Sequence, residues 1–466
     1  MTGRSRIWLN PCDYMVYNHH CLMRRKSQGD YRCMMAVDVD GHVEPDRVRG
    51  ALALAMAAHP ATMAGLGVDL VWGRPYWRLP RPIDAAASQA AAAAHRFVDL
   101  SKQPDCPGCL ERSVRTSLAA SWDYAAGPQL RLDQYALADG RTRFCLRWPH
   151  FLTDAEGAQG FLYDLGRFDQ AASGEPFSSP SIDRADAAGR EPIDVLAPYS
   201  TAQRIRLFRR ALAAMREPPA GRLISLFPQR FPPATSHGLL HRCWDAASVS
   251  RLHAAAKSTT PAGPGLYARH LIACVIRGLH RIYVEHNVDT DAYAITLPVR
   301  VAPPVSSETT RSGRPVHGNY LVPLTISGRR DLITDMQALG EDILRQHRRF
   351  LDGRMDLHWC SVMWALSHLR LSMYQALLKL DLGYVPLAAG FSYYGEIDPP
   401  IRSLGGKNVT NVWGSSLVAT PPGWNVAFSR FRDSLNLALT YACPAVAGEM
   451  AVRFLDYIEA EMFTAT

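Results

Sequence analysis

Strand-like apolar runs and helix-like segments follow one another along the first third of the chain. Residues 33–39 (CMMAVDV) predict a strand, and a helix is predicted to begin near Pro45 and Asp46. Residues 130–137 and 142–148 flank an Asp-Gly turn, which predicts a β-hairpin. A further helix is predicted at 154–168, directly after the second hairpin strand.

A polar segment at 169–200, rich in Ser, Pro, Asp and Gly, separates two halves of mixed pattern. Residues 201–216 then predict a basic amphipathic helix whose Arg face is expected to be solvated, with contact to a membrane surface or to a partner as the alternative. Neither half shows regular βαβ alternation, which indicates an α/β (α+β) fold with mixed sheets and argues against a Rossmann sheet. Further elements are expected as a hairpin at 70–79, an alanine helix at 85–94, a loop at 102–112, helices at 265–286, 331–351, 358–380 and 445–462, and strands at 292–301, 318–327, 388–397, 411–419, 425–431 and 434–441.

Composition adds expectations about location and partners. The 466 residues are 47% hydrophobic and 20% charged, which is ordinary for a globular protein with a substantial core. The net charge is +8, and nearly all positively charged residues are arginines. They are spread along the chain, so nucleic-acid binding is not expected. No apolar stretch is long enough to span a membrane, and no signal peptide stands at the N-terminus. We expect a cytoplasmic protein with no membrane contact.

Metal-binding patterns are incomplete in this sequence. Cys106 and Cys109 form a single CxxC without the second pair that a zinc site needs, so two free thiols in a loop are expected. His237 and His241 lie four residues apart, but the HExxH glutamate is missing and the segment has a strand-like pattern. We therefore expect no metal.

The candidate chemistry centres on LRWPHFLTDAEG at residues 146–157. The bare pattern HxxxD occurs four times, beginning at His42, His95, His150 and His241. Only His150 follows a strand that closes a hairpin and precedes a glycine-containing helix, and such a position can hold a general base at the edge of a cleft. The carboxylate of Asp154 then falls at a helix start, where capping and the helix dipole favour it.

An ordered set of segments resembles one superfamily over nearly the whole chain. The segments are DRVRGALALAMAAHP (46–60), GPQLRLDQYALADGRTRFCLRWPHFLTDAEGAQGFLYDL (127–165), LPVR (297–300), GN (318–319), SYYGEI (392–397), the loosely matching NVWG (411–414) and PPGWNVAFSRFRDSLNLALTY (421–441). Together they resemble the superfamily of condensation domains, BAHD-type alcohol acyltransferases and chloramphenicol acetyltransferase. This resemblance implies two chloramphenicol-acetyltransferase-like lobes in a V-shaped pseudo-dimer with a central channel. It also implies a monomer, with an N-terminal lobe at residues 1–180, a linker at 181–235 and a C-terminal lobe at 236–466.

The resemblance further implies an acyltransferase that moves an acyl group from a thioester to a hydroxyl or amine, in specialised-metabolite or lipid biosynthesis. His150 would be the general base, and Asp154 would shape the site with Gly157 and a pairing Arg300. The implied donor is acyl-coenzyme A or a phosphopantetheinyl thioester, with an acyl or peptidyl carrier protein as a possible partner and no permanently bound cofactor. The oxyanion could be served by backbone amides beside Ala155–Gly157 or by side chains. Side chains that could serve it or line the channel are those of Ser392, Asn411, Trp413 and Ser415.

Two positions depart from the HHxxxDG form of the motif. Pro149 stands in place of its first histidine and Ala155 in place of its glycine, whereas the base and the aspartate are kept. Three functions therefore stay open: an acyltransferase using acyl-coenzyme A, a free-standing condensation-type enzyme using a carrier-protein thioester, and a module that binds a carrier or metabolite with altered or no activity.

Overall fold

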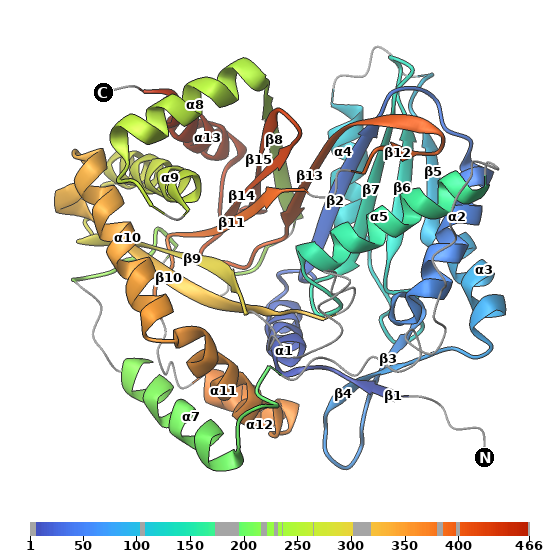
Figure 1. The fold of residues 1–466 in the computed structure, drawn as a ribbon, viewed down its shortest axis with the longest axis horizontal. Helices are drawn as coiled ribbons and strands as arrows, with labels where there is room; N and C mark the ends of the chain where they lie inside the picture. The colour runs from blue at the N-terminus through green and yellow to red at the C-terminus, as the bar shows by residue number, and fades with distance from the viewer. Residues whose placement is uncertain are drawn as a thin grey trace.

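The computed structural model describes residues 6–102, 108–172, 195–215, 221–227, 232–234, 236–263, 265–301, 318–379, 385–397 and 401–464. These residues form two lobes that lie side by side, each built on a six-stranded mixed sheet (Figure 1). The mixed α/β fold with two lobes is as the sequence predicts. A small third sheet of three strands lies at the base of the first lobe.

The sheet of the first lobe has the strand order β12-β13-β2-β7-β6-β5. Its central strands are rich in apolar residues, and every residue of β2 is buried. Helices α2, α3 and α5 cover one face, and α4 lies on the other side (Figure 1). The elements are β2 (Arg32–Val39), α2 (Pro45–Ala58), α3 (Ile83–Ala94), β5 (His95–Asp99), α4 (Cys109–Ala119), β6 (Arg131–Ala136), β7 (Thr142–Pro149) and α5 (Ala155–Ala172).

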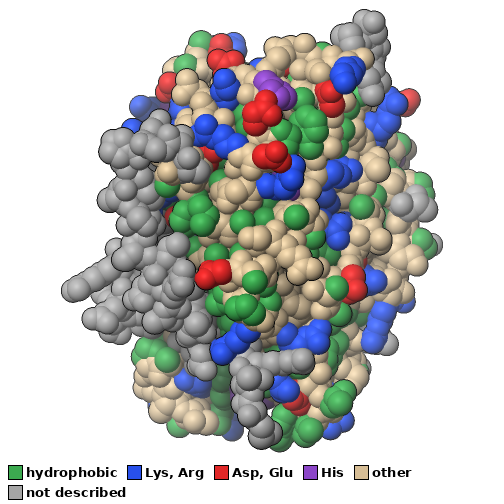
Figure 2. Space-filling model, turned by 90° about the vertical axis from the view of Figure 1, so that its right-hand side faces the viewer, with side chains coloured by type: hydrophobic (Ala, Val, Ile, Leu, Met, Phe, Trp, Pro, Cys, Tyr) green, Lys and Arg blue, Asp and Glu red, His purple; other side chains and the backbone are tan. Residues whose placement is uncertain are grey.

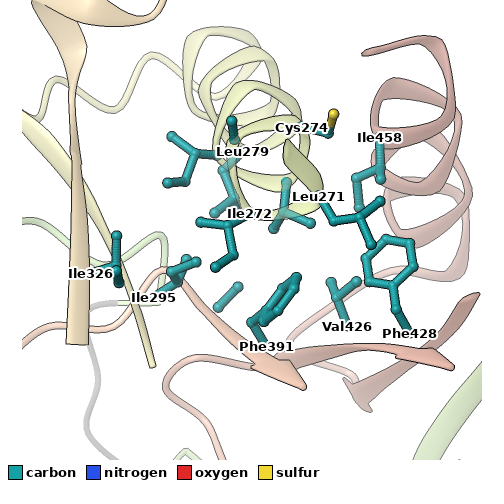
Figure 3. Close-up of a cluster of buried hydrophobic side chains, with 14 of the residues drawn as sticks. Leu271, Ile272, Cys274, Leu279, Ile295, Ile326, Phe391, Val426, Phe428 and Ile458 are labelled. Carbon is teal, nitrogen blue, oxygen red and sulfur yellow. The ribbon is translucent and has the colours of Figure 1, made fainter. Parts of the chain in front are cut away.

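The second lobe is built on the order β10-β9-β11-β14-β15-β8. Its core lies between this sheet and helices α9 and α13, as Figure 3 shows for Leu271, Ile272, Phe391, Val426 and Phe428. The elements are β8 (Ser236–Trp244), α8 (Ala246–Thr259), α9 (Leu266–Glu285), β9 (Ala292–Arg300), β10 (Leu321–Arg329), α10 (Met336–Asp352), β11 (Ala389–Glu396), β14 (Trp424–Phe431), β15 (Ser434–Cys443) and α13 (Gly448–Phe463).

One strand crosses between the lobes. β13 (Lys407–Ser416) lies in sequence between β11 and β14 of the second lobe, yet it pairs antiparallel with β2 of the first lobe, with Val412 opposite Val37. The short β12 (Ser403–Leu404) extends the same sheet. The sheet of the first lobe is therefore completed by the C-terminal half of the chain.

Several predicted boundaries shift in the structure. The hairpin expected at 70–79 is formed by β3 (Gly65–Val68) and β4 (Pro75–Arg78), and β1 (Arg6–Trp8) pairs with β4. The helix expected at 358–380 is two helices, α11 (Met355–Ser367) and α12 (Leu371–Lys379), and the one expected at 331–351 begins at Met336 after a short 3-10 turn. The predicted basic helix is α7 (Thr201–Met215), which packs on α11, and most of the polar segment before it lies outside the described residues.

The expected loop at 102–112 also needs correction. Helix α4 begins at Cys109, directly after Gly108 in the left-handed region with φ 75°. Cys109 is disulfide-bonded, so the expectation of a free thiol at this position is wrong.

Candidate active site

His150 lies directly after strand β7, at the end of the sheet where Pro149 is paired with Arg32 of β2. Its backbone N–H donates to the carbonyl oxygen of Tyr31 at 3.0 Å, which continues the β2–β7 ladder by one residue. The imidazole stands 4.8 Å from the Tyr31 ring, centroid to centroid, and the Tyr31 ring in turn meets the ring of His19. His150 is only half-buried, so the residue keeps contact with solvent.

The surroundings favour a neutral imidazole at His150. Burial lowers its pKa, and this effect outweighs the nearby Asn319 amide and its own backbone, which raise the pKa. Atom Nδ1 is buried and finds no hydrogen-bond partner among the residues that the structure describes. The neighbouring His19 has its pKa lowered to about 4 by burial and by His150. Both rings are therefore uncharged near neutral pH, as a proton acceptor must be.

A segment of the second lobe holds the loop that carries His150. The side-chain amide of Asn319 donates to the backbone oxygen of His150 at 2.8 Å and to the carboxylate of Asp13 at 2.8 Å. Next to it, the N–H of Gly318 donates to the carbonyl of Leu152 at 3.1 Å. The GN pair of the sequence thus fixes the His150 loop from the opposite lobe.

Asp13 ties the same cluster to helix α1 (Pro11–Arg25), which lies between the lobes (Figure 1). Asn10 and Asp13 form a reciprocal capping box at the start of this helix, with Asp13 N–H donating to Asn10 Oδ1 at 2.7 Å. Asp13 also accepts the backbone N–H of Asn319 at 2.7 Å. Its side chain is buried, and desolvation raises its pKa to about 7 although these hydrogen bonds lower it.

Asp154 has a structural position at the start of α5. Its two carboxylate oxygens accept the backbone N–H groups of Gly157 at 3.1 Å and Tyr320 at 3.2 Å. One of these donors belongs to its own helix and the other to the second lobe. Burial raises the pKa of Asp154, whereas these two amides lower it. The carboxylate therefore joins the two lobes and occupies the Gly157 amide, which is not free to serve an oxyanion.

The predicted pair of Asp154 and Arg300 takes a different form in the structure. Arg300 Nη1 lies 3.3 Å from Glu156 Oε2, and both of these side chains are about half exposed. Asp154 is buried with both oxygens bonded to backbone amides, so the guanidinium reaches the outer carboxylate instead. Arg300 still lowers the pKa of Asp154 through its charge.

The four predicted oxyanion or channel residues are spread along two strands. Asn411 and Trp413 are paired with Asp38 and Ala36 of β2. Arg32 marks the end of β2 next to His150. Asp38 lies about 20 Å along the strand from Arg32, and Ala36 about 13 Å, so Asn411 and Trp413 are far from the imidazole. Asn411 is bonded instead to Asn436, at 2.8 and 3.0 Å.

Trp413 and Ser415 differ in what their side chains meet. The Trp413 ring stacks on His241 at 4.0 Å, between centroids. Ser415 is nearer to the His150 end of the sheet, opposite Met34, and its buried hydroxyl has no partner within the described part of the chain. Ser392 is half-buried on β11, where it pairs with Ala427 of β14.

Aromatic residues beside His150 were missed by the sequence reasoning. Tyr31 precedes β2, and Tyr394 of β11 comes close enough to Gly414 that a Cβ there would meet its ring at 2.7 Å. Burial is the main cause that raises the pKa of Tyr394, and Cys33 and Tyr31 add to it, which places these groups close together. Tyr31 lies in none of the segments that carry the resemblance, and Tyr394 lies within SYYGEI but was not singled out. Asn319 likewise carried a signal through its GN pair.

A cavity of about 580 Å³ lies on the other side of this loop. It is lined by one face of α1, including Tyr17, His20 and Arg24, and by residues 121–125, and His150 is not part of its lining. The ring of Phe151, the residue after His150, packs against the cavity-lining rings of Tyr17 and His20, with centroids 5.2 and 5.0 Å apart. The cavity is therefore close to the His150 loop but separate from the imidazole.

Within the described ranges, no group of three or more His, Cys, Asp or Glu side chains could hold a metal ion. The described helices also include none with the length and apolarity needed to cross a bilayer.

The two-lobed architecture is the fold of coenzyme A-dependent acyltransferases and condensation domains. No family model matches the sequence, and no curated protein matches it either. Among solved structures, the chain is similar to the first condensation domain of the calcium-dependent antibiotic synthetase in complex with a substrate analogue, with TM-score 0.69, 18% identity and coverage of 99% of this chain and 98% of that one.

Two other structures show the same architecture. Trichothecene 15-O-acetyltransferase TRI3 from Fusarium sporotrichioides matches with TM-score 0.67 and 14% identity over 98% of this chain and 95% of that one. A variant of the starter condensation domain of rhizomide synthetase, in complex with C8-CoA and Leu-SNAC, matches with TM-score 0.62 and 13% identity over 99% and 95%.

Proposed function

We propose that this protein is an acyltransferase that moves an acyl group from a thioester to a hydroxyl or amine, with His150 as general base. The observation that carries the proposal is a neutral imidazole, on a half-buried residue, in a loop fixed by both lobes. The fold, shared over nearly the full chain with an acetyltransferase and several condensation domains, supports this reaction class. The proposed lobes are residues 1–180 and 236–466, joined through 181–235, with strands 403–416 returning to the first lobe.

The reaction would take place in one attack and one collapse. Because Nδ1 is buried, Nε2 of His150 is the nitrogen that takes the acceptor proton as its oxygen or nitrogen attacks the thioester carbonyl carbon. The tetrahedral intermediate then collapses, the carbon–sulfur bond breaks, and the imidazolium returns the proton to the leaving thiolate. The developing oxyanion needs a donor, and Ser415 is the candidate among the predicted residues whose hydroxyl is unpartnered among the described residues.

The proposed donors are acyl-coenzyme A or a phosphopantetheinyl thioester. One structure of this fold holds C8-CoA and Leu-SNAC, and another holds a substrate analogue, which supports a thioester donor and a small acceptor. Asp154 acts through the loop rather than on the substrate, since both its oxygens face backbone amides.

The test is acyl transfer by the purified full chain, measured as thiol release from a panel of acyl-coenzyme A donors and from loaded carrier protein. We expect His150→Ala to lower turnover by about 10²- to 10⁴-fold with an unchanged melting temperature. His42→Ala, at an exposed HxxxD histidine, is the matched control and should keep full activity. A His150→Ala variant with a near-wild-type single-turnover rate would refute the proposal.

A second candidate function is a condensation-like module that binds a carrier or metabolite without acyl transfer. The departures at Pro149 and Ala155 favour it, because they alter the loop on both sides of His150. Tight binding of a loaded carrier without thiol release, in wild type and His150→Ala alike, would support this alternative.

A further inference from the structure

The tip of the β3–β4 hairpin exposes three consecutive apolar side chains. Leu70 is 97% exposed, Val71 64% and Trp72 67%. An exposed apolar run of this kind is unusual on a soluble domain and marks an interaction site. The hairpin projects from the lower edge of the molecule in Figure 1.

Several backbone groups of this tip already have hydrogen-bond partners within the protein. The Asp69 carboxylate accepts the N–H groups of Val71 at 3.0 Å and Trp72 at 2.9 Å, and the N–H of Gly73 donates to the Asp69 carbonyl at 2.8 Å. The carbonyl of Val71 accepts from Arg370 at 2.8 Å. Polar groups that are already bonded cost less to move into lipid, so these bonds lower the cost of bringing the tip into an interface.

Neighbouring helices extend the same end of the molecule. Helix α12 begins beside the tip, through Arg370, and exposes Met373 and Leu377. Helix α7 packs on α11 and exposes Ile205 among arginines. The tip, α12 and α7 all lie along the lower edge in Figure 1. Figure 2, which views the right-hand side of Figure 1, shows hydrophobic and Lys/Arg side chains at the lower edge of that face.

The charge of this end is one-sided. Helices α7 and α12 contain no acidic residue, and the one acid of the hairpin, Asp69, is occupied by the tip backbone and by Arg6. Exposed arginines on α7 and directly before α12 are Arg206, Arg209, Arg210 and Arg370. Tryptophan and leucine at a convex tip, flanked by arginines, fit a bilayer surface with negatively charged headgroups.

We propose that this end of the molecule, defined as the Leu70–Trp72 tip with α12 and α7, docks on an anionic lipid surface. The tip inserts into the headgroup region, and the arginines contact lipid phosphates. The sequence left a membrane-facing Arg face at 201–216 open as an alternative, but it did not indicate that the Leu70–Trp72 tip takes part. The proposed docking is independent of His150 and of the proposed reaction.

The test is co-flotation of the full chain with vesicles of phosphatidylcholine alone or with 30% phosphatidylglycerol. We expect binding to the anionic vesicles, weakened in 0.5 M salt, and at least tenfold weaker for Leu70→Ser/Trp72→Ser. Leu54→Ser removes a Leu that is 43% exposed on α2 and is the matched control, which should bind like wild type. His150→Ala should also bind like wild type, which separates this test from that of the reaction.

Two results would overturn the proposal. One is that the wild-type protein floats with neither the neutral nor the anionic vesicles. The other is that the tip variant and Leu54→Ser bind the anionic vesicles equally well. If the tip variant instead abolishes self-association seen by light scattering while vesicles are ignored, the tip is a protein contact and the lipid proposal fails.

Discussion

Replacing Asp13 with asparagine removes a carboxylate that the fold keeps almost fully out of water. Its pKa is raised from 3.8 to about 7, chiefly by desolvation. A carboxyl with a raised folded pKa stabilises the fold most below its unfolded pKa, and this stability is lost as pH rises through the folded value. Between pH 5 and 8 the loss is about 3 kcal/mol in the wild type, and Asp13→Asn should not show it.

Thermal unfolding of both proteins from pH 5 to 8 measures this effect. The melting temperature of Asp13→Asn minus that of wild type should rise with pH up to about 7 and then level off. For a chain of this length the rise is about 3 °C if all of it unfolds together, and more if one lobe unfolds alone. The variant also loses the 3.3 Å bond from the Asn10 N–H, but this cost does not depend on pH.

Asp245→Asn is the matched control, because Asp245 caps α8 through the Ser248 N–H at 2.9 Å in an exposed position. Hydrogen bonding lowers its pKa, so over pH 5 to 8 its difference from wild type should be flat. Parallel curves for Asp13→Asn and wild type, or a difference that falls with pH, would show that Asp13 is not destabilised by burial.

Three further variants test the loop and the crossing strand. Asn319→Ala removes the amide that holds the His150 backbone and should lower kcat at least tenfold with little change in KM, whereas a KM effect alone would contradict a positioning role. Asp154→Ala leaves two buried amides unpaired and should cost about 2–4 kcal/mol of stability, and an unchanged melting temperature would count against it. Gly405→Ala places a Cβ 2.1 Å from Val43 and should destabilise far more than Gly140→Ala, which has a similar positive φ but open space around it.

Local pattern was sufficient where neighbouring residues decide the structure. The hairpin predicted at 130–137 and 142–148 is found at Arg131–Ala136 and Thr142–Pro149, because an Asp-Gly turn and flanking apolar runs are local signals. The position of His150 at the end of that hairpin could be predicted for the same reason.

Local pattern failed where tertiary contacts decide. A hairpin was predicted at 70–79, yet the apolar residues 70–72 form the exposed tip between two strands and the first strand lies before them. The segment 358–380 has helical spacing throughout and no Gly or Pro before residue 383, yet it breaks between Ser367 and Leu371. Both parts contact α1, whereas the extensive packing against α7 is made by α11. The sequence contains no signal for this difference.

The hydrogen bonds that hold the His150 loop could not be predicted from the sequence for a different reason. Asn319 is 169 positions from His150 and 306 from Asp13, so the three meet only because the lobes do. The sequence marked Asn319 through its GN pair, but no pattern in the sequence marked Asp13. Such a polar residue supports the site because it is buried against the other lobe, and burial of this kind cannot be read from a single sequence.

These contacts also show that the two lobes depend on each other. Strand β13 pairs along seven positions with β2, from Val409 to Ser416, so the first half alone would leave the central strand β2 with an open edge. Asn319 and Tyr320 meanwhile hold the His150 loop from the second lobe. A large rotation of one lobe would break the β13–β2 ladder and the His150 support together. Substrate entry should therefore leave this junction closed and use movements of loops and side chains around it.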